Sequence, residues 1–278
     1  MAERTAAPWQ TGSTAATIAA TAPHPAAASP RNNLLLAALP ATEYDSLLPH
    51  LKPIRLPLGW IMHFAGDRET SLYFITSGIV SRYNVMMNGA TAGHALTGRE
   101  GMIGIASILG GASTPTQAVV VSTGFSWRLR IDALPGGLER HSALQQLLYR
   151  YTEALMTETA QSAACNRHHS VEQQLCRWVL STLDRSPSNE LVLTHELIAG
   201  MLGVRREGVS EAAAALQKAG LIHSSRGRMT VLDRAGLEAR ACECYAVVRR
   251  AYEQMRVPRS RSANAAPRGI FAECLVAS

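Results

Sequence analysis

The stretch Leu197–Ile222, "LIAGMLGVRREGVSEAAAALQKAGLI", predicts two short helices separated by a glycine, with charged residues crowded at the start of the second helix. Thr194 is suited to cap the first helix, and Gly203 is suited to the tight turn that ends it. Two steeply crossing helices also need a small residue at their contact and an apolar residue that pins the second helix. Ala199 and Val209 supply both, so we predict a helix-turn-helix with Ala199, Gly203 and Val209 in its core.

The second helix divides into an apolar face and a polar face. At helical periodicity, Val209 and Leu216 fall on the apolar side, while Arg206 and Glu207 lie in the first turn toward the polar side. A recognition helix places its N-terminal residues against base edges in the major groove, and the alanines that follow leave room for that approach. Arginine offers a bidentate fork to guanine, and a carboxylate accepts from the cytosine amino group. We therefore predict base contacts from Arg206 and Glu207.

The segment after the second helix, "LIHSSRGRMTVLD", predicts two short strands around a turn at Arg226 and Gly227. Such a wing carries Arg226 and Arg228 toward phosphates, which position a protein on DNA without reading its sequence. At the helix starts we expect two further backbone contacts, from Thr194 and Arg205.

Ahead of this helical unit the chain has a different pattern. Residues 34–50 predict a helical pair, and residues 51–130 give short β-leaning runs such as "SLYFITSG" and "QAVVVS", separated by Gly, Pro, Asn and Asp. This pattern predicts an antiparallel β-roll, and hence an α+β protein. The divisions we predict are a disordered tail at 1–30, the β-roll at 31–138, a long dimerisation helix at 139–168, the winged helix-turn-helix at 169–256 and a disordered tail at 257–278.

The predicted long helix carries apolar residues at steps of four, three and four, the spacing of a heptad seam, which Glu158 and Ser162 then weaken. Two interpretations stay open: the helix packs against its own domain, or it pairs with the same helix of a second chain. We predict the second, with a dimer seam formed by Leu144, Leu148, Tyr151 and Leu155.

Composition limits the class of protein. The 278 residues are 47% hydrophobic and 17% charged, and no uninterrupted apolar run is long enough to span a membrane. Of the net charge of +6, five charges lie in residues 165–278, which permits a polyanionic partner. Five cysteines, an odd number, do not resemble the disulfide framework of a small secreted domain, so we expect a reducing cytoplasm.

The order of parts resembles the Crp/Fnr family of bacterial transcription regulators. The resemblance covers roughly residues 34–252, and its best carriers are "LYFITSGIV" and "LTHELIAGMLGVRREGVSEAAAALQKAGLI". It implies a cyclic-nucleotide-binding-like β-roll, a dimer helix, a winged helix-turn-helix, binding of double-stranded DNA as a homodimer on an imperfect palindrome, and RNA polymerase as a partner. By the same resemblance Arg206, Glu207 and Ser210 match base-contacting positions. Glu211 departs from it, since an arginine is common there.

The residues that bind cyclic AMP in some members of the family are replaced in this chain. In members that bind cyclic AMP, a glycine–glutamate pair holds the ribose, and an arginine followed by a small polar residue holds the phosphate. Here Gly104 is followed by Ile105, and Thr116 and Gln117 stand where the arginine and its neighbour would be. A buried phosphate needs a cation or several donors to replace its hydration. We predict a degenerate pocket without cyclic-nucleotide binding; a cyclic-nucleotide-responsive regulator is the alternative.

A thiol- or metal-responsive regulator is the other alternative. Family members with an iron–sulfur cluster use cysteines near the N-terminus, and this chain has none before Cys165. Zinc and cluster sites usually show longer, paired spacings, so we predict buried thiols and neither a metal nor a cofactor. The residues that could in principle form such a site are Cys165, His168, His169, Cys176, Cys242 and Cys244.

An enzyme is the competing class of function. The histidines and carboxylates form no nucleophile elbow, phosphate loop or H-E-x-x-H group, so we predict that the protein is not an enzyme.

Overall fold

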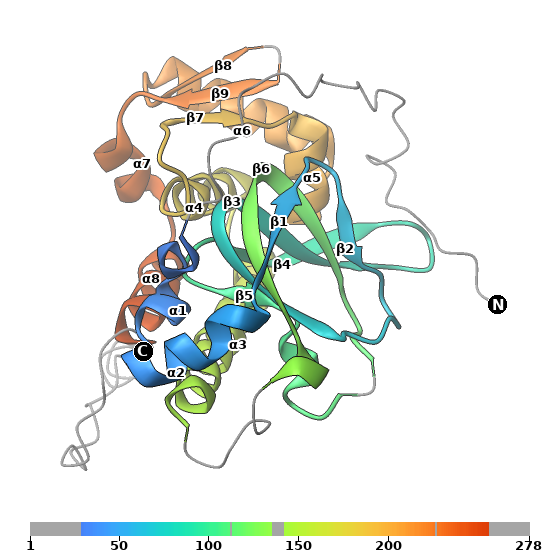
Figure 1. Ribbon diagram of the computed structural model, residues 1–278. Coiled ribbons are helices and arrows are strands. Elements are labelled where there is room, and N and C mark those ends of the chain that lie inside the picture. Colours follow the sequence, from blue (N-terminus) through green and yellow to red (C-terminus); the bar gives the residue numbers. More distant parts are fainter. Residues whose placement is uncertain (1–28, 112, 135–141, 226, 256–278) are drawn as a thin grey trace, which may run out of the picture.

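The computed structural model describes residues 29–111, 113–134, 142–225 and 227–255. Most of both predicted tails, and Arg226 of the predicted wing, lie outside the described residues. The described chain forms an antiparallel β-roll, a long helix and a helical unit with a small sheet, so the predicted α+β architecture is confirmed (Figure 1).

Six strands form the roll within the described residues, and all of their pairings are antiparallel. The strand order is β1-β6-β3-β4, while β2 pairs with β6 and β5 pairs with β3. The strands are β1 (Lys52–Leu56), β2 (Ile61–His63), β3 (Ser71–Val85), β4 (Thr91–Thr97), β5 (Met102–Ile103) and β6 (Gln117–Arg130).

The two longest strands, β3 and β6, bend together at a pair of glycines. Gly78 has a φ of 80°, and a Cβ added there would lie 2.6 Å from the Ser122 carbonyl oxygen. A Cβ at Gly124 would lie 2.0 Å from the Ser77 carbonyl oxygen. The ladder shifts register on either side of this point, so the glycines allow the strands to cross closely enough to curl the sheet.

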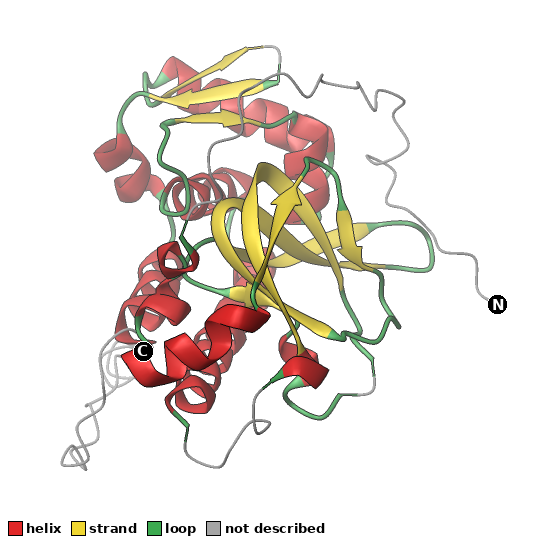
Figure 2. Cartoon of the chain, in the orientation of Figure 1, coloured by secondary structure: helices red, strands yellow, loops and turns green. Residues whose placement is uncertain are grey.

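Helices cover one end of the roll, where Figure 2 shows them gathered beside the sheet. The N-terminal ones are short: 3₁₀ turns at Pro30–Asn32 and Leu48–His50, with α1 (Leu34–Ala37) and α2 (Ala41–Leu47) between them. Asn33 caps α1, because its Oδ1 accepts from the backbone N–H groups of Leu35 and Leu36. Further 3₁₀ turns lie at Ile105–Ser107 and Ile131–Ala133.

The residues of the predicted dimer seam in helix α3 (Ala143–His168) lie against the chain's own core. Leu144, Leu148 and Tyr151 are buried in the core that the roll and N-terminal helices share with α3, and Leu155 packs against it. An apolar stripe marks the buried side of a helix but does not say whose surface covers it. The chain's own roll covers this one at Leu144, Leu148 and Tyr151, whereas Leu155 is only partly buried.

Glu158 and Ser162, which weaken the apolar stripe, bind the rest of the chain. The Glu158 carboxylate accepts from the Leu96 backbone N–H at 3.2 Å and from the Tyr252 hydroxyl at 2.7 Å. Arg185 lies 3.5 Å from Glu158 and 2.6 Å from Glu100. Burial lowers the pKa of Arg185, but Glu100 and Glu158 raise it more, so it stays above its ordinary value. This buried network joins β4, α3, the end of α4 and α8.

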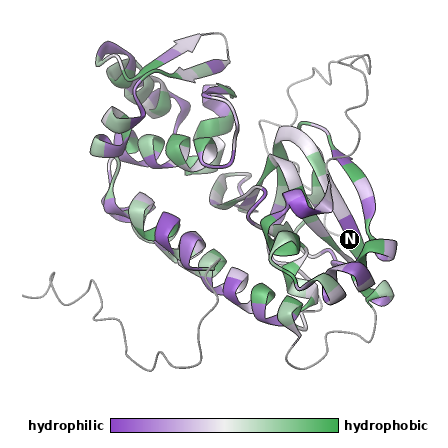
Figure 3. Cartoon of the chain, turned by 60° about the vertical axis from the view of Figure 1, so that its left-hand side comes forward, coloured by the Kyte–Doolittle hydropathy of each residue, from purple (hydrophilic) through white to green (hydrophobic). Residues whose placement is uncertain are grey.

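The C-terminal unit consists of helices around a three-stranded sheet in the order β7-β9-β8. Figure 3 shows it beside the roll, with the long helical segment leading from one to the other. Its elements are α4 (Val171–Leu183), β7 (Glu190–Val192), α5 (His195–Leu202), α6 (Arg206–Lys218), β8 (Ile222–Ser225), β9 (Arg228–Val231), α7 (Arg234–Arg240) and α8 (Glu243–Met255).

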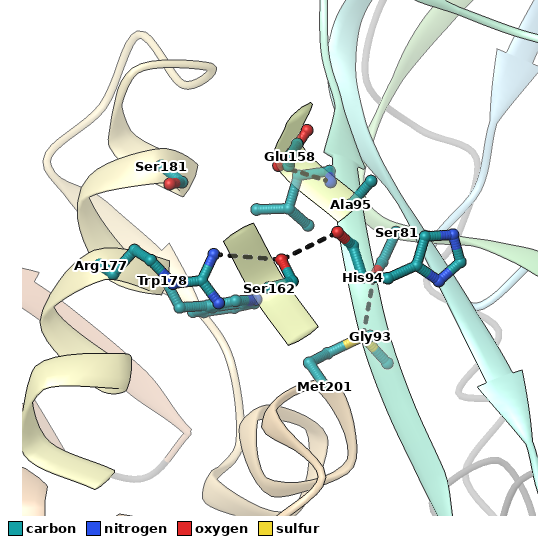
Figure 4. A pocket seen from close by; sticks show the side chains of 11 residues that line it. Ser81, Gly93, His94, Ala95, Glu158, Ser162, Arg177, Trp178, Ser181 and Met201 are labelled. Carbon is teal, nitrogen blue, oxygen red and sulfur yellow. Dashed lines mark hydrogen bonds between the residues drawn. The ribbon is translucent and has the colours of Figure 1, made fainter. Parts of the chain in front are cut away.

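The C-terminal unit rests on β4 of the roll. The Thr91 hydroxyl donates to the Gly200 carbonyl at 2.9 Å, and the Ser81 hydroxyl donates to the Met201 sulfur at 2.8 Å. Figure 4 looks into the junction, where Arg177 donates to the Ser162 hydroxyl and that hydroxyl donates to the His94 carbonyl. Only about 20 Å³ of cavity remains there, so the two units are closely packed.

Replacing Arg185 with Met removes the cation from the buried network, leaving Glu100 and Glu158 without their ion-pair partner. Breaking a buried pair in this way costs about 3–5 kcal/mol of unfolding free energy, which urea denaturation measures. Arg130→Met is the control, because the Arg130–Asp132 pair is exposed and its loss should leave the unfolding free energy nearly unchanged. Equal losses in the two variants would contradict the assigned role of the network.

Candidate nucleic-acid interface

Helices α5 and α6 meet through small and apolar residues. Thr194 caps α5, because its hydroxyl accepts from the Leu197 N–H at 3.1 Å. Gly203 ends α5 in the left-handed region with a φ of 68°, which glycine adopts without strain. Ala199 and Val209 are both buried in the core of the unit. The structure therefore places Ala199 and Val209 in the core of the helix pair, and Gly203 at the exposed turn that joins the two helices.

The first turn of α6 is the exposed end of that helix. Arg205 is the N-cap, and Arg206 and Glu207 follow it; all three are exposed. The buried side chains of α6 lie on its opposite face, at Val209, Ala212, Ala213 and Leu216. The unit docks on the roll through the end of α5, where a Cβ added at Gly203 would lie 3.2 Å from the Ala92 Cβ of β4.

Ser210 is held inside the protein more firmly than the sequence suggested. Its hydroxyl lies 3.0 Å from the Nδ1 of His195 and donates to the Arg206 carbonyl at 3.1 Å. The Nε2 of His195 lies 3.3 Å from the Ser224 hydroxyl of β8. Burial, together with the charge of Arg206, lowers the pKa of His195. A neutral imidazole therefore links the wing to the recognition helix, a role that no periodicity in the sequence signals.

The wing lies next to the helix pair. Strands β8 and β9 pair with each other, and β7 adds to the outer edge of β9. Arg228 forms an exposed ion pair with Glu190 of β7. An exposed pair of this kind is worth about 0–1 kcal/mol, so Arg228 can exchange Glu190 for a phosphate at small cost.

The four residues predicted to form a degenerate effector pocket do not lie together. A cavity of about 200 Å³ opens beside β2, β3 and β5, and of the four only Gly104 lines it. Gln117 is buried and its Oε1 accepts from the Tyr83 hydroxyl at 2.9 Å. Ile105 packs against the core next to α3, and Thr116 lies beside Thr114. No arginine or lysine stands at the two predicted phosphate positions.

Glu69 fills the place of an anion in that cavity. Its carboxylate accepts from the Ala106 N–H at 3.0 Å and lies 3.2 Å from the Nδ1 of His63. Burial and the charge of Arg82 lower the pKa of His63 to about 4, so the imidazole is neutral at pH 7. The backbone donor at the start of the 3₁₀ turn is thus used by the chain's own carboxylate.

Helix α3 also presents an uncovered face. Tyr149 is 54% exposed and Met156 is 67% exposed, although both are large and apolar. They line a shallow groove of about 510 Å³ together with Thr152, Glu153, Thr157 and Ala160. This face, one residue along from the predicted seam, is the side of α3 that the roll leaves open.

Among the described residues no helix is both long and apolar enough to cross a membrane.

Two family models match the chain in the order of its units. The cyclic nucleotide-binding domain matches residues 53–141, and the Crp-like helix-turn-helix domain matches residues 173–240. No curated protein matches the chain.

Solved structures share the fold at low sequence identity. FixK2 from Bradyrhizobium japonicum aligns with a TM-score of 0.58 at 15% identity, covering 69% of this chain and 98% of its own. The CRP/FNR-family transcriptional regulator TTHA1359 from Thermus thermophilus gives 0.57 at 19% identity, covering 68% and 98%. TTHB099, a CRP-family regulator from the same organism, gives 0.57 at 22% identity, covering 68% and 96%.

The turn between the two helices offers a stability test with a matched control. Gly203→Ala should lower the unfolding free energy by about 1–2 kcal/mol, because a left-handed φ strains any side chain and the added Cβ would lie 3.2 Å from the Ala92 Cβ. Gly208→Ala lies inside α6, where a Cβ meets nothing closer than 3.8 Å, and should add up to about 1 kcal/mol. Chemical denaturation of the two variants measures both; a neutral Gly203→Ala would refute the turn.

Proposed function

Since the chain belongs to the Crp/Fnr family of transcriptional regulators, we propose that it is a sequence-specific DNA-binding regulator that acts as a homodimer on an imperfect palindrome. The observation that carries the proposal is the exposed first turn of α6, with Arg205, Arg206 and Glu207 at the tip of a helix whose other face is buried. The family is one of transcriptional regulators rather than enzymes.

Arg206 and Glu207 read base edges in this proposal, and Ser210 supports the turn beside them. Ser210 can also reach a base if its hydroxyl turns from the Arg206 carbonyl and donates to a base acceptor. Thr194, Arg205, Arg226 and Arg228 contact phosphates, which set the orientation of the unit on the duplex. Of these, Arg226 lies outside the described residues.

The second copy of the chain pairs along the open face of α3. Tyr149 and Met156 stand seven residues apart, one heptad, and Thr152 lies between them, so one seam can hold all three. Such a pair of helices spaces two recognition helices about 34 Å apart, one turn of DNA. In this proposal the regulator works in the cytoplasm, and its protein partner at the promoter is RNA polymerase.

The regulator works without a cyclic nucleotide. Glu69 already occupies the Ala106 amide, and Asp67 adds a second carboxylate to the same cavity, so a bound phosphate would meet negative charge there. Arg68 also lines the cavity, but the two carboxylates face the same space, and Glu69 already takes the Ala106 N–H that a phosphate would need in place of its hydration.

Replacing Arg206 with Ala tests the base contact. The variant should lose about 1–3 kcal/mol of operator binding and relax preference at one base pair, because a bidentate contact is removed. Lys218→Ala, which removes the same charge from the far end of α6, should leave affinity unchanged.

Replacing Arg228 with Ala tests the phosphate contact. The variant should bind all DNA sequences more weakly by a similar factor, and the slope of log affinity against log salt concentration should fall by about one. Gel-shift titrations on a selected duplex at several salt concentrations measure all three; parental behaviour in both arginine variants excludes the groove assignment.

Replacing Met156 with Glu tests the dimer face. An unpaired charge in an apolar seam is costly, so the variant should sediment as a monomer and stay folded, since Met156 is exposed in the single chain. Leu148→Ala is the opposite case: it should lower stability by about 2–5 kcal/mol through a core cavity. If analytical ultracentrifugation finds Met156→Glu still dimeric, the pairing face lies elsewhere.

Cyclic nucleotides should leave the fold unchanged. A ligand that binds only the folded state stabilises it by about 2.7 kcal/mol at a hundred times its dissociation constant, so thermal unfolding is a sensitive test. We expect no rise in Tm with millimolar cyclic AMP or cyclic GMP, and operator binding without added nucleotide. A dose-dependent rise in Tm would show that the cavity is a working nucleotide site.

A further inference from the structure

Three thiols and one imidazole converge beside the end of α3. Cys165 lies in the last turn of α3 and His169 is its C-cap, while Cys242 and Cys244 flank Glu243 at the start of α8. The ligating atoms of these four side chains all lie within 4.8 Å of one another. Two separations are shorter: 3.5 Å between the Cys165 and Cys242 sulfurs, and 3.7 Å between the Cys244 sulfur and the His169 Nδ1.

These separations fit the edges of a tetrahedron around one ion. With zinc–sulfur bonds of about 2.3 Å and a zinc–nitrogen bond of about 2.0–2.1 Å, tetrahedral geometry places two sulfurs about 3.8 Å apart and a sulfur and nitrogen about 3.6 Å apart. We propose that Cys165, His169, Cys242 and Cys244 bind one zinc ion as a Cys₃His site. Such a site would exist whether or not the proposed function holds.

Burial and pairing favour a metal over unrelated buried thiols. The three cysteines form a small buried cluster of their own and are free rather than disulfide-bonded. Apolar packing explains buried thiols, but it does not explain an imidazole nitrogen directed at them. Structural zinc sites close four such ligands around the ion, away from solvent.

A histidine that binds a metal through one ring nitrogen usually donates its other ring N–H to a carboxylate or carbonyl, and Glu243 is placed to accept it. Its carboxylate lies 3.3 Å from the Nε2 of His169, the ring nitrogen on the side away from Cys244. A carboxylate at that nitrogen fixes the tautomer that leaves Nδ1 free to bind the ion, and it raises the basicity of the ring. Glu243 stands between two of the cysteine ligands in the sequence, so the short Cys-Glu-Cys segment provides both the ligands and their partner.

The compact arrangement favours one ion over an iron–sulfur cluster. A cluster of two or four irons holds its cysteines around several metal atoms and spreads them further apart than a single ion does. The fourth described cysteine, Cys176, is also buried, but it is not among the four converging side chains. It therefore provides a matched control for the three thiol ligands.

The ion would tie two distant parts of the chain together. Cys165 and Cys242 are 77 residues apart in the sequence, and their sulfurs join the end of α3 to the segment between α7 and α8. Helix α3 leads directly into α4 of the DNA-binding unit. The sequence-based prediction of merely buried thiols weighed spacing along the chain, whereas the folded chain brings four ligands from two segments to one point.

Metal content of the full-length protein tests the proposal. Protein reconstituted with zinc under reducing conditions and then desalted should hold one zinc per chain by mass spectrometry. Cys242→Ser and Cys244→Ser should lose it, while Cys176→Ser should keep it. Glu243→Ala changes an exposed side chain and leaves every ligand in place, so it should fold and bind zinc about 10–100-fold more weakly in a chelator competition.

Cobalt substitution of the unmutated protein keeps the test decisive if the cysteine variants fail to fold. Cobalt in this site should give the visible bands of a tetrahedral ion and sulfur-to-cobalt charge transfer for three thiolates. An octahedral cobalt spectrum, zinc content unchanged in the folded cysteine variants, or the absorption of an iron–sulfur cluster in the purified protein would each overturn the proposal.

Discussion

The carboxylate of Glu158 is held by three separate parts of the chain. It accepts from the backbone of β4 and from Tyr252 of α8, and it faces Arg185 just after α4. A buried carboxylate is costly to leave unpaired, so α3 has one rotation about its axis in which this group is satisfied. That rotation decides which side of α3 covers the roll and which side remains open. The position of α8, and of the cysteines at its start, follows from the same constraint.

Local patterns in the sequence were enough to predict the units of the fold. The glycine turn between α5 and α6, the wing and the short strands of the roll each depend on residues close together in the chain. The face of α3 depends on residues far apart. The stripe through Leu148 and Tyr151 has the same period whether a roll or a second helix covers it, and the polar residues that interrupted it were the clue to a satisfied buried contact.

In the region of the predicted effector pocket, the sequence indicates which residues are unusual but not which side chains meet in the folded chain. Ile105 and Thr116 stand where binding residues are expected, which is visible in the order of residues alone. The role of Glu69 depends on folding, because it lies 37 residues from the amide that it binds. The same is true of His195, which links Ser210 to the wing, and of the four side chains that converge on one point near Cys165.

The central claim is that two copies of the exposed α6 turn read a two-fold symmetric operator, and selection of bound sequences from random duplex DNA tests it most directly. The account predicts enrichment of an inverted repeat whose half-sites are about one helical turn, or 34 Å, apart. Enrichment of a single asymmetric site, or of no sequence at all, would contradict it.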